Sequence, residues 1–424
     1  MADDAKKSGV RDKVVTLASL EMPMREIPER ESVPQESLRD ALTRERYYQV
    51  VERLRQATAD SGSNVLITVQ DREVSLLQSA MAREAAQTAP LDTGGLEVKF
   101  GTGFGGGDWF GWIKSLLDWV DRREAHPLLR PSNTTAAPFP DHARVAMTAD
   151  WGTGLYGAPK IAQRMTQMGS FDLLMHLGDV YYSGTEEEIQ ERFLDVWPRT
   201  AGAISRALNS NHEMYSGGFG YFTRALPALG QTASYFAFQN AHWLLVGLDT
   251  AYVDHAMDSE QVAWLNVVIR NAGNRKVVLC SHQQLFSRLD NQGPKLQQAL
   301  RHLLESRSIT AWYWGHEHQC VIYDPHPRYG LRARCLGNGG IPSVREKEVR
   351  NAPAERTQGA VSWKRLTTTA DSPSCLALDG PNPDIKGEEQ KFVPHGFMTL
   401  EFNGPALTER VFLSDGTEIY SATL

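Results

Sequence analysis

Carboxylate and imidazole side chains stand directly after apolar segments at several places in the second half of the chain. The segments are RVAMTA, LLMHLG, KVVLCS and ITAWYWG, and the residues that follow them are Asp150, Asp179, His282, and the pair His316 and His318. Taken alone, each such residue is more often a helix cap or a hydrogen-bonded structural residue. Together with Asn211, they offer carboxylate oxygens, an amide oxygen and imidazole nitrogens, which suit a pair of metal ions. The combination predicts a metal centre.

Five short motifs occur in a fixed order between Arg144 and His318. They are D-W-G from Asp150, G-D-V-Y-Y from Gly178, N-H-E from Asn211, the single His282, and G-H-E-H from Gly315. In this order the motifs resemble those of the calcineurin-like metallophosphoesterase superfamily, and within it they most resemble the purple acid phosphatases. The resemblance reaches no further toward the N-terminus. It implies a metal-dependent hydrolase of phosphate esters.

Two positions favour the purple acid phosphatase group. Much of the superfamily has a metal-ligating His where this chain has Gly152, and the purple acid phosphatases fill that role with a Tyr. Tyr182, three residues after Asp179, matches the spacing of that Tyr, and we expect Tyr181 to pack into the core. A phenolate is a hard anionic donor that suits ferric iron.

The resemblance implies how the ligands divide between two ions. The first ion would take Asp150, Asp179, Tyr182 and His318. The second would take Asp179 as a bridge, together with Asn211, His282 and His316. The first set carries three anionic donors and the second mostly neutral ones, so a trivalent and a divalent ion are expected. We expect Fe(III) with Zn, Mn or Fe(II).

Such a centre would hydrolyse phosphomonoesters by in-line attack of a metal-bound hydroxide. His212, next to Asn211, is the candidate general acid, although it could instead only hydrogen-bond near the site. Arg288 and Asn211 are candidate substrate contacts, and Arg288 is equally well explained as a solvated surface residue. Ser210 replaces the Gly that usually precedes the Asn-His pair, and Gln283 and its neighbours replace His residues that often follow the strand-end His.

Two other functions stay open. The same centre could cleave phosphodiesters, including nucleotides or cyclic nucleotides. From a different class, the fold could be a non-catalytic scaffold that binds a protein partner, because fold does not imply function. A scaffold would be expected to have lost ligands, and this sequence keeps them all.

The elements that must position these residues form an α/β domain over residues 143–424. Apolar strands alternate with helical segments from Arg144 onward, and closing strands follow in GFMTLEF and LTERVFL. This pattern and the resemblance predict a layered β-sandwich flanked by helices, with polar residues at the carboxyl ends of strands. Residues 342–391 are charged and rich in Thr, Pro and Asp. They are predicted to be a loop or lid insertion.

The residues before 143 contain no pattern that indicates a particular chemistry. Residues 1–32 are predicted to be a flexible arm, 33–125 a small α/β accessory domain and 126–142 a linker. Helices are expected from Ser37 to about Ala59 and from Val74 to Ala85, with strands NVLITV and LEVKF. Glycines at 101, 103 and 106 fit a dinucleotide-binding pattern only weakly, and a turn is favoured. Self-association or protein binding through this region stays open.

Composition restricts the partners and the compartment. The net charge is −7 and the pI is near 6.0. The chain therefore lacks the basic footprint of a standing nucleic-acid partner. No apolar run approaches the roughly 20 residues of a membrane-spanning helix, and the N-terminus does not resemble a secretory signal. The four cysteines are too scattered for a disulfide framework, so a cytoplasmic location is expected. The resemblance to phosphoesterases implies a phosphorylated small-molecule substrate.

Overall fold

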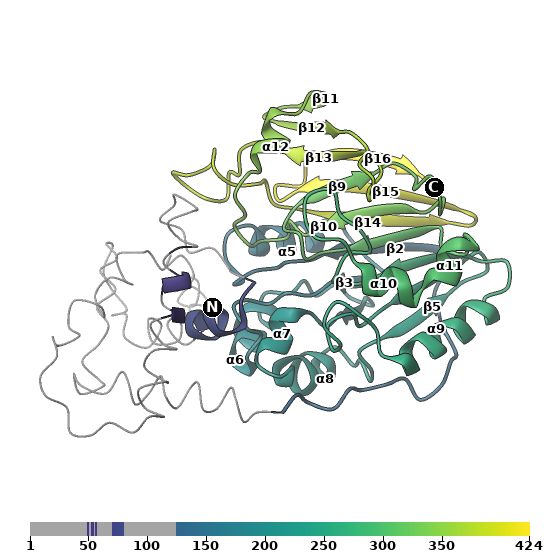
Figure 1. Cartoon of the computed structure of the whole chain (residues 1–424). Helices are drawn as coiled ribbons and strands as arrows, with labels where there is room; N and C mark the ends of the chain where they lie inside the picture. The colour runs from purple at the N-terminus through teal and green to yellow at the C-terminus, as the bar shows by residue number, and fades with distance from the viewer. Residues whose placement is uncertain (1–48, 51, 55, 57–69, 80–123) are drawn as a thin grey trace, which may run out of the picture. The chain divides into compact units, whose positions relative to one another are not determined.

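The computed structural model describes residues 49–50, 52–54, 56, 70–79 and 124–424 (Figure 1). The described residues between 49 and 56 are helical and lie within the first expected helix. Residues 72–79 are also helical and begin two residues before the helix expected from Val74. The arm at 1–32, the strands NVLITV and LEVKF and the glycine turn lie outside the described residues. The chain divides into two units, and the larger one comprises His126–Met214 and Gly218–Leu424.

A six-stranded sheet has the order β16-β15-β14-β2-β3-β4. Its strands are β2 (His142–Thr148), β3 (Leu173–His176), β4 (Ile204–Ala207), β14 (Gly396–Asn403), β15 (Ala406–Leu413) and β16 (Glu418–Thr423). β2, β3 and β4 are parallel, whereas β14, β15 and β16 run antiparallel to their neighbours. The three parallel strands therefore end at the same edge of the sheet.

A ten-stranded sheet has the order β1-β5-β6-β7-β8-β10-β9-β13-β12-β11. Its strands are β1 (Ala137–Pro138), β5 (Phe236–Gln239), β6 (Trp243–Gly247), β7 (Lys276–Cys280), β8 (Ala311–Trp314), β9 (Cys320–Tyr323), β10 (Arg332–Leu336), β11 (Ala354–Gln358), β12 (Val361–Leu366) and β13 (Cys375–Asp379). β6, β7, β8 and β10 are parallel. Beyond β10 the sheet is antiparallel.

The two sheets pack face to face, because alternate side chains of each strand point to opposite faces. In β6, Leu245 lies in the core between the sheets, whereas Leu244 and Val246 lie in the outer core of the ten-stranded sheet. In β2, Val145 belongs to the core between the sheets and Ala146 to the outer core of the six-stranded sheet. Strands that are buried on both faces explain the continuous apolar runs of the sequence.

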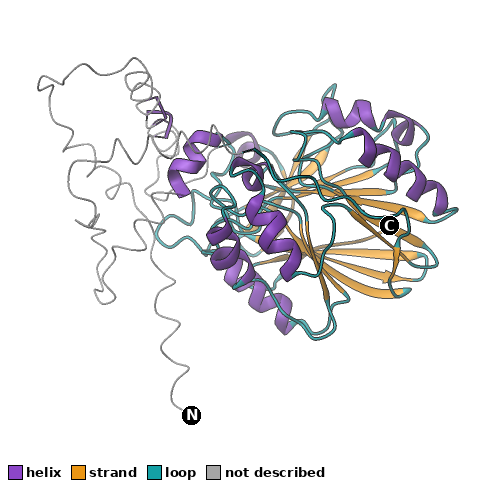
Figure 2. Cartoon of the chain, turned by 90° about the horizontal axis from the view of Figure 1, so that it is seen from below, coloured by secondary structure: helices purple, strands orange, loops and turns teal. Residues whose placement is uncertain are grey.

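Helices cover the outer faces of both sheets, as Figure 2 shows. α9 (Ser259–Asn271), α10 (Pro294–Ala299) and α11 (Arg301–Glu305) contribute to the outer core of the ten-stranded sheet. α5 (Gly157–Gln167), η1 (Ile189–Leu194), η2 (Tyr221–Ala225) and α8 (Leu226–Ala228) contribute to that of the six-stranded sheet. The remaining short helices are α6 (Glu186–Glu188), α7 (Asn211–Tyr215) and α12 (Lys347–Asn351). The predicted layered α/β sandwich is confirmed.

The prediction of a loop or lid at 342–391 is wrong. This segment contains α12 and the strands β11, β12 and β13, which extend the ten-stranded sheet. Val361 and Trp363 of β12 are buried in the core between the sheets. The sequence suggested a loop because every residue of the edge strand β11 is exposed, so this strand has no hydrophobic pattern. The predicted linker at 126–142 includes β1, which pairs with β5. Within the described part of the chain, no helix is long and apolar enough to cross a membrane.

Candidate metal centre

Loops at the carboxyl ends of the parallel strands carry the predicted ligands. Asp150 follows β2, Asp179 follows β3, and Asn211 begins α7 after β4. His282 follows β7, and His316 and His318 follow β8. The six residues therefore come from both sheets, and the sandwich brings the edges of its parallel strands together. The metal-ligand clusters that result share one residue, Asp179.

The first cluster contains Asp150, Asp179 and His318, with ligand atoms that all lie within 4.8 Å of one another. The hydroxyl of Tyr181 lies among them. It is 2.7 Å from Nε2 of His318 and 3.2 Å from Oδ1 of Asp150, and it donates a hydrogen bond to Oδ2 of Asp179. Two carboxylates, a phenol and an imidazole thus surround one point.

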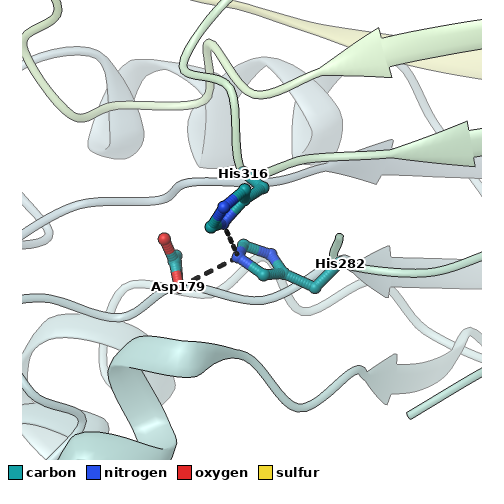
Figure 3. Close-up of side chains that lie close together, drawn as sticks. All are labelled: Asp179, His282 and His316. Carbon is teal, nitrogen blue, oxygen red and sulfur yellow. Dashed lines mark hydrogen bonds and ion pairs between the residues drawn. The ribbon is translucent and has the colours of Figure 1, made fainter. Parts of the chain in front are cut away.

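The second cluster contains Asp179, His282 and His316 (Figure 3). Nε2 of His282 is 3.2 Å from Oδ1 of Asp179 and 3.2 Å from Nδ1 of His316. Oδ1 of Asn211 lies 3.1 Å from the same nitrogen. Nδ1 of His282 lies 2.9 Å from the carbonyl oxygen of Leu177, so Nδ1 must carry a hydrogen. Nε2 of a neutral His282 would therefore present a lone pair to three other electron-pair donors.

A positive charge at this point would relieve this concentration of electron pairs, and the pKa shifts of the surrounding residues agree with that position. Burial lowers the pKa of His282, but Asp179 raises it, and the result is a pKa of about 9. Burial alone would raise the pKa of Asp179, yet His282 and His212 hold it well below its usual range. Without metal, a proton on His282 is thus the compensating charge. A metal ion at the same place would replace that proton.

The two remaining imidazoles suit metal ligation. Burial lowers the pKa of His318 to about 4 and that of His316 well below its usual range. Both rings are therefore neutral at pH 7, which is the form that binds a metal ion. Burial and the nearby Asp179 raise the pKa of Asp150 well above its usual range, and the opposing effect of His282 offsets them only in part. The donor set fits a dinuclear centre.

The backbone at the centre is held in an uncommon conformation. Five of the seven non-glycine residues with positive φ in the described chain lie here: Asp150, Asp179, His255, His316 and His318. Such conformations cost free energy and cluster at functional sites. The loops also approach one another closely. A Cβ on Gly315 would lie 2.6 Å from Oδ2 of Asp150, so only glycine fits between β8 and the D-W-G loop.

The structure corrects the choice between the two tyrosines. Tyr181, which we expected in the core, points its hydroxyl into the first cluster. The ring of Tyr182 lies instead under the guanidinium of Arg192, 5.6 Å from it, and its backbone N–H donates to Glu188 at 2.8 Å. Spacing along the sequence could not reveal this, because it does not determine the direction in which adjacent side chains point in a loop.

His212 lies beside the centre and is fully buried. Its Nδ1 donates to the carbonyl oxygen of Tyr182 at 2.6 Å, and its Nε2 is 3.9 Å from Oδ2 of Asp179. Its ring packs against that of Tyr181, with 4.2 Å between ring centroids. Burial lowers the pKa of His212. The general-acid role of His212 stays a proposal.

The guanidinium of Arg288, a candidate phosphate contact, is paired with other residues of the domain. Its guanidinium donates two hydrogen bonds to Glu348 of α12, at 2.5 and 3.1 Å, and a third to the carbonyl oxygen of Thr367. The residue holds the extension of the sheet in place. The sequence showed only an arginine after the strand-end His, because its partner lies 60 residues further along.

Three supporting residues were missed or left without a role. The hydroxyl of Ser210 contacts both Asp179 and Glu213. Nε2 of Gln283 is 3.4 Å from Oδ1 of Asn211. His255, in the loop after β6, places Nε2 3.3 Å from Nε2 of His316. Ser210 and Gln283 were visible as departures from the family pattern, whereas no motif pointed to His255.

Residues 143–320 match the family of calcineurin-like phosphoesterases. The matched segment contains all of the candidate metal ligands named above. The resemblance drawn from the five motifs is thereby confirmed. No curated protein matches the sequence.

A solved structure shows a similar fold. The purple acid phosphatase PPD1 from seeds of yellow lupin (Lupinus luteus) superposes with a TM-score of 0.50 and 15% identity. The match covers 69% of this chain and only 55% of the lupin enzyme. GAP50, the anchor in the inner membrane complex of Plasmodium, superposes with a TM-score of 0.45 and 13% identity, over 67% of this chain and 88% of its own.

Proposed function

We propose that the phosphoesterase domain hydrolyses phosphomonoesters at a centre of two metal ions. The observation that carries this proposal is the pair of ligand clusters that share Asp179, one on each side of its carboxylate. Two ions that share a bridging carboxylate are typical of hydrolytic centres that displace a leaving group in line. Bound there, the ions would activate water and polarise the phosphate ester.

We propose a revised ligand set. The first ion would be held by Asp150, Asp179, Tyr181 and His318, and the second by Asp179, Asn211, His282 and His316. Three anionic donors at the first position favour a trivalent ion, and Fe(III) with Zn, Mn or Fe(II) stays our expectation. Tyr181 replaces Tyr182 because its hydroxyl lies 2.7 Å from Nε2 of His318.

The other residues of the site would hold the ligands in place and exclude water. Burial removes Asp150, Asp179 and His282 from solvent, which strengthens their interaction with bound charge. The backbone N–H of His316 donates to Oδ2 of Asp150 at 2.8 Å and fixes the G-H-E-H loop to the D-W-G loop. We assign to His212 the role of proton donor to the leaving oxygen.

The test is metal analysis together with hydrolysis of phosphomonoesters, phosphodiesters and nucleotides. We expect about two ions per chain and the fastest hydrolysis with a monoester. Asp179→Asn keeps the shape but removes the bridging charge. It should reduce hydrolysis by at least about 100-fold, since even outer-shell partners of metal ligands contribute 10- to 100-fold. A metal-loaded protein that hydrolyses none of these esters would contradict the proposal.

A further inference from the structure

The loop between β6 and α9 brings a histidine to the edge of the second ligand cluster. His255 lies in this loop in a left-handed conformation, with φ of 54°. The N–H of Ala256 donates to the carbonyl oxygens of Thr250 and Val253, at 3.2 and 2.7 Å. Lys295 donates to the carbonyl oxygen of Asp254 at 3.0 Å. The loop is therefore held firmly although His255 itself is 38% exposed.

His255 connects a carboxylate to a metal ligand. Its Nδ1 lies 2.7 Å from Oδ1 of Asp254, and its Nε2 lies 3.3 Å from Nε2 of His316. The rings of His255 and His316 are nearly perpendicular, with an interplanar angle of 80° and 5.0 Å between centroids. The other nitrogen of His316, Nδ1, faces the cluster, 3.2 Å from Nε2 of His282. The order of contacts is thus Asp254, His255, His316 and then the cluster.

This order determines where the hydrogens lie. A carboxylate only accepts hydrogen bonds, so Nδ1 of His255 carries a hydrogen. In the tautomer with a single ring hydrogen, Nε2 of His255 is then an acceptor. Nε2 of His316 must then donate to it. Nδ1 of the neutral His316 is left with its lone pair directed into the cluster, which is the form that a metal ion requires.

We propose that His255 is a positioning residue that fixes the tautomer and the orientation of His316 for the second metal ion, with Asp254 fixing His255 in turn. A metal-ligating histidine commonly donates its other N–H to an acceptor that sets its tautomer and raises its basicity. Here a second histidine, backed by a carboxylate, is that acceptor. The inference rests on the proposed metal centre and assigns a role to a loop that none of the five motifs includes.

The test compares His255→Leu, which cannot accept a hydrogen bond, with His255→Gln, whose side-chain oxygen can. The affinity for Zn²⁺ is measured by competition with a chelator, and the tautomer of His316 in the metal-free protein is measured by ¹⁵N NMR. Loss of an outer-shell partner typically weakens metal binding by about 10- to 100-fold. We expect such a loss at one of the two sites in His255→Leu, partial recovery in His255→Gln, and a mixed tautomer of His316 only in His255→Leu.

His302→Leu is the matched control. His302 lies on α11, where its Nε2 contacts Oδ1 of Asn266 at 2.6 Å. This variant should bind Zn²⁺ like the unmodified protein. Equal affinities in His255→Leu and the unmodified protein would overturn the inference, as would equal losses in His255→Leu and His255→Gln. An unmodified protein that binds no metal would refute the proposed function instead, and the NMR comparison would then decide on His255 alone.

Discussion

Asp179 is the residue on which the two ligand clusters depend, because its two carboxylate oxygens face different partners. Oδ1 faces Nε2 of His282 and the hydroxyl of Ser210, whereas Oδ2 accepts from the hydroxyl of Tyr181. Burial alone would raise the pKa of this carboxylate, but the nearby His282 holds it well below its usual range in the absence of metal. A negatively charged carboxylate between the two ligand clusters would stabilise a pair of bound cations.

The two adjacent tyrosines allow a direct comparison. Burial and the neighbouring carboxylates raise the pKa of Tyr181 well above its usual range. Its hydroxyl therefore loses its proton only when the oxygen binds a strong Lewis acid. If that acid is Fe(III), the protein should absorb visible light by tyrosinate-to-iron charge transfer. Tyr181→Phe should abolish the absorption band, and Tyr182→Phe should keep it. The visible spectra of the two iron-loaded variants check this, and a band lost only in Tyr182→Phe would restore the assignment made from spacing.

Metal binding should depend on pH through His282. With the pKa of this residue at about 9, the ring is protonated below pH 9 in the metal-free protein, and binding of an ion displaces the proton. The apparent affinity should therefore rise with pH. The number of protons released per bound ion, which is the slope of log affinity against pH, should fall by about one as pH passes about 9. Titrations of Zn²⁺ in buffers of different ionisation enthalpy measure this proton release. If the number of protons released per bound ion stayed constant between pH 7 and 10, the role of His282 would be contradicted.

Loops at strand ends position the ligands through close backbone contact. Gly315 lies where a Cβ would come within 2.6 Å of Oδ2 of Asp150 and closer still to the Cβ of Ala149. Gly315→Ala should therefore push the G-H-E-H loop away from the D-W-G loop. We expect a stability loss of about 1–3 kcal/mol, as for overpacked cores, together with weaker metal binding. Urea unfolding and chelator competition measure both, and an unchanged metal affinity would show that the loops tolerate separation.

Much of the element order could be predicted because buried parallel strands leave apolar runs that end in polar residues. Asp150, Asp179 and His282 were chosen this way, and in the structure β6, β7 and β8 are consecutive parallel strands. β11 could not be predicted, since an exposed edge strand carries no hydrophobic signal. The hydroxyl of Tyr181 and the loop of His255 could not be predicted either, because both depend on backbone conformations that leave no periodic pattern.

At the scale of the whole domain, a buried ion pair joins the two sheets. Arg334 on β10 donates to Glu409 on β15, with Nε at 2.8 Å and Nη2 at 2.5 Å from Oε1, and Tyr313 on β8 donates to Oε2 at 3.0 Å. Both charged side chains are buried, with exposures of 4% and 0%. The pair fixes the relative position of the sheets whose edges carry the ligands.

Glu409→Leu should destabilise the domain by about 3–5 kcal/mol, because it leaves the guanidinium of Arg334 buried without its carboxylate. Glu401→Leu is the matched control. Glu401 lies on β14, where it is 37% exposed and pairs with Arg410 at 3.5 Å. Exposed pairs contribute about 0–1 kcal/mol. Urea unfolding of both variants measures the difference, and equal losses would show that the buried pair has no special role between the sheets.

The most direct test of the proposed centre is anomalous X-ray diffraction from crystals of the metal-loaded protein. We predict two anomalous peaks about 3.5–4 Å apart, as in other dinuclear hydrolytic centres. One peak should lie among Asp150, Tyr181 and His318 and the other among Asn211, His282 and His316, with the carboxylate of Asp179 between them. A single peak, or peaks away from Asp179, would contradict the dinuclear centre.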